Sequence, residues 1–220
     1  MDTARTIRVT GKGLVRLHPD RTCLTITLSG TEPEYADALA RAVREAGMLK
    51  AAFAPLGFAA SDLKTLQFHV EPEYEGETDK QGRYRQRFVG YRAVQSLKLS
   101  FDSDNELLGR TLYAMAHAGL QPEFQLSYTV RDPETAKNAL LGAAVADAAA
   151  KARVLAEAAG VRLGTIQTVD YSWGRVELEA PVARNRMFAA KAEMADGFSL
   201  EIEPDDIEVS DAVTVIWSID

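Results

Sequence analysis

Two runs of acidic side chains are the feature of this 220-residue sequence most able to do chemistry. The first covers residues 71–79 and the second residues 201–208. Carboxylates act as general acids and bases and as ligands of hard cations. Neither run has the calcium-loop pattern, which needs a central glycine and a terminal bidentate glutamate. Because a catalytic carboxylate pair is defined by its separation in space, an enzyme with an acidic surface site at either run stays open as an alternative.

The first acidic run also fits a hairpin. Three glutamates alternate before a turn at residues 78–82, and three arginines alternate after it. The pattern predicts antiparallel strands with Glu77 opposite Arg83 and Glu75 opposite Arg85, and with Tyr74 on the other face. Each exposed pair stabilises by only about 0.2–1 kcal/mol, so we expect this ladder to set the register, protect an edge or contact a partner. The charged residues of the ladder are Glu73, Glu75, Glu77, Arg83, Arg85 and Arg87.

Other motifs that could carry chemistry are weaker. Gly11-Lys12-Gly13 lacks the helix that must follow a phosphate-binding loop, so it is expected to be a structural bend in a strand. The three histidines and one cysteine do not make a zinc-ligand pattern. Cys23 lies in an apolar alternating segment and is expected to be a buried hydrophobe. The sequence therefore predicts no catalytic residue, no metal site and no cofactor.

Strands and helices follow from the apolar periodicity. We predict helices over residues 35–56, 105–118 and 133–159. Their N-terminal caps are expected at Thr31 with Glu34 in a capping box, at Asp102 or Ser103, and at Asp132. Strands are predicted over residues 7–9, 14–17, 23–28, 64–75, 83–101, 124–130, 163–171 and 207–219. This order predicts an α+β fold in a single domain over residues 1–220, a mainly antiparallel sheet with three helices packed on one face.

An irregular segment at about residues 175–203 combines apolar residues with cations, including Arg184, Arg186, Met187, Phe188 and Met194. Methionine and arginine are enriched at the cores of protein interfaces. We therefore expect this arm to pack on another subunit and to support self-association. A mobile loop is the alternative that loop lengths leave open.

Composition narrows the class of partner. Hydrophobic residues make up 46% and charged residues 26% of the chain, which is typical of a folded globular protein. The net charge of −7 excludes a surface that tracks nucleic acid or an anionic membrane. The sequence contains no apolar run long enough to span a membrane and no evident leader segment, so the chain as given is expected in the cytoplasm. A periplasmic or cell-envelope location is the alternative.

Short strings spread over nearly the whole chain carry a resemblance to a known family: Ile7–Gly13 with Pro19-Asp20, Leu66–Phe68 with Pro72 and Tyr74, Gly90–Ala93, Ala146–Ala148, Lys151-Ala152, Leu155-Ala156, Gly160–Gly164, Val209-Ser210 and Val213–Val215. In these strings the sequence resembles the SIMPL-domain family, whose members include YggE-like proteins. No single string is diagnostic, but their order is the expected one.

The resemblance implies a modest set of functions. Some members of the family are periplasmic or outer-membrane-associated and linked to oxidative-stress tolerance, one forms a large ring-like homo-oligomer, and a mammalian namesake is a signalling adaptor. No catalytic residues are established for the family. The sequence is therefore expected to encode a non-catalytic, oligomeric binding or scaffold protein, with an acidic-site enzyme or a protein–protein adaptor as alternatives.

Overall fold

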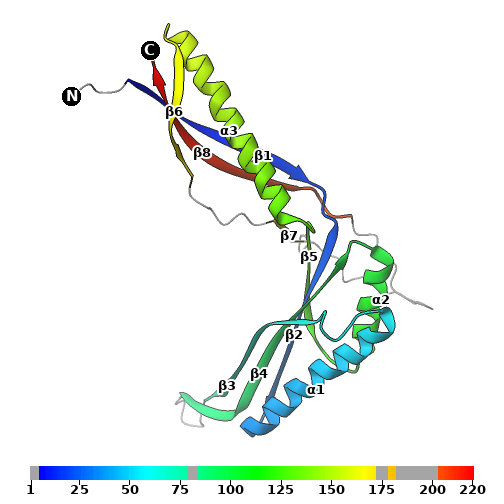
Figure 1. Ribbon diagram of the computed structural model, residues 1–220. Coiled ribbons are helices and arrows are strands. Elements are labelled where there is room, and N and C mark those ends of the chain that lie inside the picture. Colours follow the sequence, from blue (N-terminus) through cyan, green and yellow to red (C-terminus); the bar gives the residue numbers. More distant parts are fainter. Residues whose placement is uncertain (1–4, 79–83, 172–177, 182–202) are drawn as a thin grey trace. The chain divides into compact units, whose positions relative to one another are not determined.

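The computed structural model describes residues 5–78, 84–171, 178–181 and 203–220 (Figure 1). The chain divides into two compact units, which are described separately. Unit 1 contains residues 1–20, 129–180 and 204–220, and unit 2 contains residues 21–128 and 181–203. The predicted α+β fold is confirmed, but the helices are divided between two antiparallel sheets instead of covering one. The expectation that the whole chain folds as a single domain stays a prediction.

Unit 1 is a three-stranded sheet with one long helix on one face. The strand order is β1-β8-β6, and its elements are β1 (Thr6–Leu17), β8 (Ile207–Ile219), β6 (Leu163–Asp170) and α3 (Pro133–Ala158). Helix α3 begins as predicted, because the Asp132 side chain accepts a hydrogen bond from the Thr135 backbone N–H at 3.0 Å. The alanines of its buried stripe pack against Val9, Val213, Val215 and Trp217.

Gly11 and Gly13 do not form the predicted bend. Strand β1 is continuous and keeps its register with β8 through both residues. A Cβ at Gly11 would overlap the carbonyl oxygen of Ala144, and one at Gly13 would overlap that of Leu140. The two glycines therefore let the backbone of α3 approach the backbone of β1 closely, which side chains at these positions would prevent.

Unit 2 is built on a five-stranded sheet with order β3-β4-β2-β5-β7. Its strands are β3 (Lys64–Thr78), β4 (Tyr84–Asp102), β2 (Arg21–Glu32), β5 (Glu123–Thr129) and β7 (Glu179–Pro181). Helices α1 (Tyr35–Phe53) and α2 (Asn105–Ala116) cover one face, and the short 3-10 helix η1 (Ala54–Leu56) follows α1. The core between the sheet and the helices includes Leu24, Ile26, Leu97, Leu99 and Leu108, all at most 1% exposed. Leu24 and Ile26 alternate along β2, as the sequence predicts, Leu97 and Leu99 alternate along β4, and Leu108 lies on α2.

The N-terminal caps of α1 and α2 differ from the sequence prediction, although both helices begin at the predicted residues. Thr31 lies inside β2, and the residue before α1 is Glu34, whose side chain makes no capping hydrogen bond. Helix α2 is capped by Asp104, not by Asp102 or Ser103, since the Asp104 carboxylate accepts from the backbone N–H groups of the second and third helical residues. In both cases the preceding strand continues further than the pattern indicates and includes a residue expected to cap the helix, Thr31 in β2 and Asp102 in β4.

Candidate interaction surface

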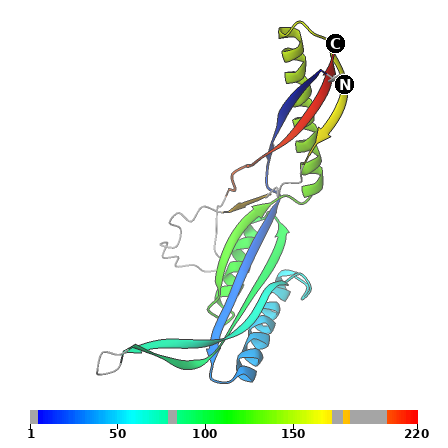
Figure 2. The same ribbon diagram turned by 90° about the vertical axis from the view of Figure 1, so that its left-hand side faces the viewer.

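Strands β3 and β4 extend beyond the rest of their sheet as a two-stranded ribbon (Figure 2). The pairing of β2 with β4 ends at Glu32 opposite Tyr91, whereas the pairing of β3 with β4 continues to Thr78 opposite Tyr84. We call residues 73–78 and 84–90 the ribbon. An isolated pair of strands is only marginally stable in water. The side chains on the two faces of the ribbon therefore determine whether it is stabilised and what it can contact.

The charged face of the ribbon confirms part of the predicted ladder. Glu75 and Arg85 lie on the same face, because Glu75 is opposite Arg87 and Glu77 is opposite Arg85. The predicted register is wrong by two residues, since Glu75 was expected opposite Arg85 and lies opposite Arg87. Arg83 lies outside the described residues. The observed register sets Tyr74 directly opposite Phe88, and this cross-strand aromatic pair accounts for the difference.

The other face of the ribbon is aromatic and carries no charged side chain. Tyr74, Phe88 and Tyr84 share this face with Gly76, Thr78 and Gln86. The exposed fractions are 54% for Tyr74, 45% for Phe88 and 70% for Tyr84. The rings of Tyr74 and Phe88 meet edge to face, with centroids 5.7 Å apart. Exposed rings concentrated on one face mark a surface for contact with another molecule.

A bulge in β4 extends this aromatic face towards α1. Val89 has no partner on β3, because Tyr74 pairs with Phe88 and Glu73 pairs with Gly90. The extra residue brings Tyr91 to the same face as Phe88, and their ring centroids are 5.3 Å apart. The ring of Tyr91 also contacts that of Tyr35, at 5.5 Å.

Gly90 is required at this bulge for two reasons. Its φ is 152°, a conformation that other residues rarely adopt. A Cβ there would also overlap the backbone of Glu32 on β2. The resemblance to the SIMPL family singled out the string Gly90–Ala93, but nothing in the sequence pattern indicated the bulge.

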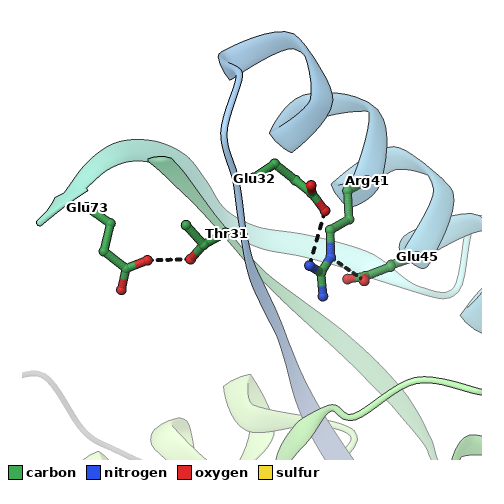
Figure 3. A network of polar contacts seen from close by, with 5 residues as sticks. All are labelled: Thr31, Glu32, Arg41, Glu45 and Glu73. Carbon is green, nitrogen blue, oxygen red and sulfur yellow. Dashed lines mark hydrogen bonds and ion pairs between the residues drawn. The ribbon is translucent and has the colours of Figure 1, made fainter. Parts of the chain in front are cut away.

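Polar contacts fasten the base of the ribbon to β2, and β2 to α1 (Figure 3). Thr31 and Glu32, adjacent on β2, point to opposite sides of the sheet. The Thr31 hydroxyl donates to the carboxylate of Glu73. On the helix side, the Arg41 guanidinium donates to Glu45 at 2.7 Å and to Glu32 at 3.3 Å. The hydrogen bond to Glu45 raises the pKa of Arg41 above its ordinary value. These contacts hold the structure together. Helical spacing could have paired Arg41 with Glu45, four residues apart on α1, whereas no sequence pattern pairs Thr31 with Glu73.

The second acidic run lines a shallow polar depression in unit 1. Its described lining consists of Arg16, Asp205, Asp206 and Glu208. Arg16 forms an ion pair with Glu208, and this hydrogen bond raises the pKa of the guanidinium. The Nδ1 atom of His18 lies 3.2 Å from the Oδ1 atom of Asp206. The Arg16 guanidinium is thus already paired with a carboxylate of this depression. Because Arg16 and Glu208 lie opposite each other on β1 and β8, their ion pair holds the register of these strands.

The remaining predicted residues divide into buried and exposed groups. Cys23 is 1% exposed, as predicted, and its Sγ lies 3.3 Å from the Ser100 hydroxyl oxygen. His69 lies beside Glu71, and the His117 ring contacts the Tyr113 carbonyl oxygen. Within the described ranges, no three His, Cys, Asp or Glu side chains are grouped to hold a metal ion. No helix in the described part of the chain is long and apolar enough to cross a membrane.

The arm predicted at residues 175–203 falls largely outside the described residues. Its predicted contact residues, Arg184, Arg186, Met187, Phe188 and Met194, all lie in the part that the structure does not describe. Within the arm, the described residues are Leu178, strand β7 and Glu203. Leu178 is 7% exposed and packs with Leu140 and Val209 in unit 1.

The fold and the ribbon define an α+β protein with two helix-covered antiparallel sheets and a projecting aromatic face. The profile of the SIMPL family, described as a protein of unknown function (DUF541), matches residues 7–217, so the chain belongs to this family. The chain is 26% identical over 215 residues to the 26 kDa periplasmic immunogenic protein of Brucella melitensis biotype 1, covering 97% of this chain and 84% of the relative. It is 24% identical over 213 residues to the uncharacterized protein YggE of Edwardsiella ictaluri, covering 95% and 84%.

Proposed function

We propose that this chain is a non-catalytic binding or scaffold protein that works as a homo-oligomer. The observation that carries the proposal is the ribbon, which leaves three large aromatic side chains about half exposed or more on a face without charge. Soluble monomers rarely leave such faces uncovered. The ion pairs and the polar network described above satisfy one another, which fits a structural role for the charged groups better than a catalytic one.

The names of the relatives support a periplasmic setting for this function. Two Brucella relatives, each 26% identical over 215 residues, are called periplasmic immunogenic proteins. This replaces the cytoplasm as the proposed location. The link to oxidative-stress tolerance that the resemblance implies is tested by the survival under peroxide of cells lacking the protein, with and without the gene restored.

The mass of the full chain in solution tests the proposed function. Size-exclusion chromatography with light scattering is expected to give a mass that is a multiple of 24.0 kDa and that rises with concentration. A chain that stays monomeric at every concentration would overturn the proposal.

Two other classes of function remain distinguishable. An enzyme using the acidic depression would lose activity in an Asp206→Asn variant while keeping its mass. A signalling adaptor would form a stoichiometric complex with a different protein and would remain monomeric alone.

A further inference from the structure

The aromatic face of the ribbon continues onto the start of α1. Four of its rings are exposed by about half or more: Tyr35 by 50%, Tyr74 by 54%, Tyr84 by 70% and Phe88 by 45%. Between Tyr74 and Tyr35 the rings form a chain of edge-to-face contacts with centroids 5.3–5.7 Å apart. No charged side chain of the ribbon lies on this face, because the alternation sends the glutamates and arginines to the other one.

The arrangement of the rings indicates which class of partner fits. A run of nucleobases stacks on the flat, open faces of successive aromatic side chains. Here neighbouring rings meet at 67–89°, so the face is a ridged hydrophobic surface of the kind that packs against other side chains. The net charge of −7 disfavours an anionic lipid surface. A protein face is the partner that remains.

The charge distribution points to a second copy of the same chain. In a two-fold contact a patch meets itself, so any charged residue near the axis faces a like charge. Within the ribbon the aromatic face avoids this penalty, and at its other end Glu32, opposite Tyr91, is held by Arg41. The described strands from Glu71 to Arg92 carry four glutamates and three arginines, so this region is close to neutral although the chain as a whole is strongly negative. Two such regions can approach each other without the repulsion that the whole chain imposes.

We propose that the aromatic face of the ribbon is a self-association surface on which the same face of a second copy packs across a two-fold axis. The proposal rests on the proposed function and specifies its contact. Aromatic side chains bury about 150–250 Å² each, so covering the exposed parts of four rings per copy buries roughly 800–900 Å² in all. Stable dimers bury about 1,200–2,000 Å². The ribbon contact by itself is therefore expected to be reversible and dependent on concentration.

The test uses charge insertion at Phe88 in the full chain. Phe88→Glu and Phe88→Lys each place like charges opposite one another in a two-fold contact, and each is expected to raise the dissociation constant at least about tenfold, or 1.4 kcal/mol. A 1:1 mixture of the two variants is expected to restore association, since opposite charges then meet. Sedimentation velocity over a concentration series measures all three samples.

A matched control separates the surface from a general effect of charge. Val43→Glu introduces the same charge at an apolar residue on α1 that is 72% exposed and outside the ribbon, and it is expected to keep the wild-type association. Far-UV circular dichroism and thermal unfolding show whether each variant is folded. Tyr84→Glu, at a more exposed position of the same face, replaces Phe88→Glu if the latter does not fold.

The outcomes separate this inference from the proposed function. Wild-type mass in both Phe88 variants overturns the ribbon contact while the oligomeric scaffold stands. Loss of association in each variant without recovery in the mixture overturns the two-fold arrangement, because the face then meets a different surface of the second copy. A monomeric wild-type chain overturns the proposed function itself, and the self-association surface falls with it.

Discussion

Single residues determine how closely the helix of unit 1 lies on its sheet. Gly11 of β1 faces the backbone of α3 at Ala144 and Ala148. These atoms of the two alanines cannot move away from an added Cβ unless the helix itself moves. Asp147 of the same helix accepts hydrogen bonds from the backbone N–H of Lys12 and from the ammonium group of Lys151, both at 2.7 Å. The glycine and the carboxylate thus act together at one contact.

The first prediction concerns Gly11. Gly11→Ala is expected to lower the free energy of unfolding by about 1–3 kcal/mol or more, because the added Cβ overlaps the helix backbone. Gly142→Ala in α3 is the matched control, since no atom lies within 4 Å of its added Cβ, and it is expected to stabilise the helix by up to about 1 kcal/mol. Urea unfolding measures both. Equal effects from the two substitutions would contradict the close-packing account.

The second prediction concerns the pH dependence of the Asp147 contact. The hydrogen bonds from Lys151 and then from Lys12 hold the pKa of Asp147 below its ordinary value. A carboxyl with a lower pKa in the folded state stabilises above its unfolded pKa of about 3.9 and loses that contribution as pH falls through the folded value. Wild type is therefore expected to be more stable than Asp147→Asn at neutral pH, and the difference should shrink below about pH 4.

Urea unfolding from neutral to acidic pH measures this difference. Asp170→Asn, at the end of β6 in the same unit, is the control for removing an exposed carboxylate. A gap between wild type and Asp147→Asn that stays constant with pH would show that the two hydrogen bonds do not favour the ionised carboxylate.

At the scale of elements, the structure places caps and bulges where strands end and change direction. The bulge in β4 brings Tyr91 into line with Phe88, and so connects the ribbon to α1. The cap of α2, Asp104, follows two residues after Asp102, the last residue of β4 that pairs with β2. The length of β4 therefore sets both the ribbon at one end and the helix start at the other.

The third prediction tests which residue caps α2. Asp104→Ala is expected to lower the free energy of unfolding by about 1 kcal/mol, because the N–H groups of Glu106 and Leu107 lose their acceptor. Ser103→Ala is expected to change it by less than about 0.5 kcal/mol. Chemical unfolding followed by far-UV circular dichroism compares them. A larger effect at Ser103 would return the cap to the position that the sequence pattern favours.

For the whole molecule, the fourth prediction concerns residues 182–202, the part of the arm that follows β7. Its mixture of cations and methionines, with Arg184 and Met187 close in sequence, is typical of interface cores. Replacing the arm by a Gly-Ser linker of equal length is expected to lower the oligomeric mass and leave the circular dichroism of the sheets unchanged. The replacement must begin after β7, since Leu178 is buried and β7 pairs in the sheet. Full assembly size in the replaced protein, measured by light scattering, would exclude the arm from self-association.

The family membership and the α+β class could be read from the sequence, because they depend on local patterns. The alternation of Leu24, Ile26 and Leu28 marks a half-buried strand without knowledge of its partners. The Asp132-Pro133 pair marks the start of α3 because a cap involves residues only three apart. The shared face of Glu75 and Arg85 follows from the period of a strand in every register that pairs odd-numbered residues of β3 with odd-numbered residues of β4.

The tertiary structure decided what depends on contacts between distant residues. The register of the ribbon differs by two residues from the predicted one because Tyr74 and Phe88 meet across the strands. Thr31 joined β2 and bonded to Glu73 instead of capping α1. Gly11 and Gly13 proved to be sites of close helix approach, which requires knowing that α3, more than 120 residues later, returns to β1. A local pattern restricts a residue's conformation and face, whereas its partner is selected only when the chain packs and all contacts compete at once.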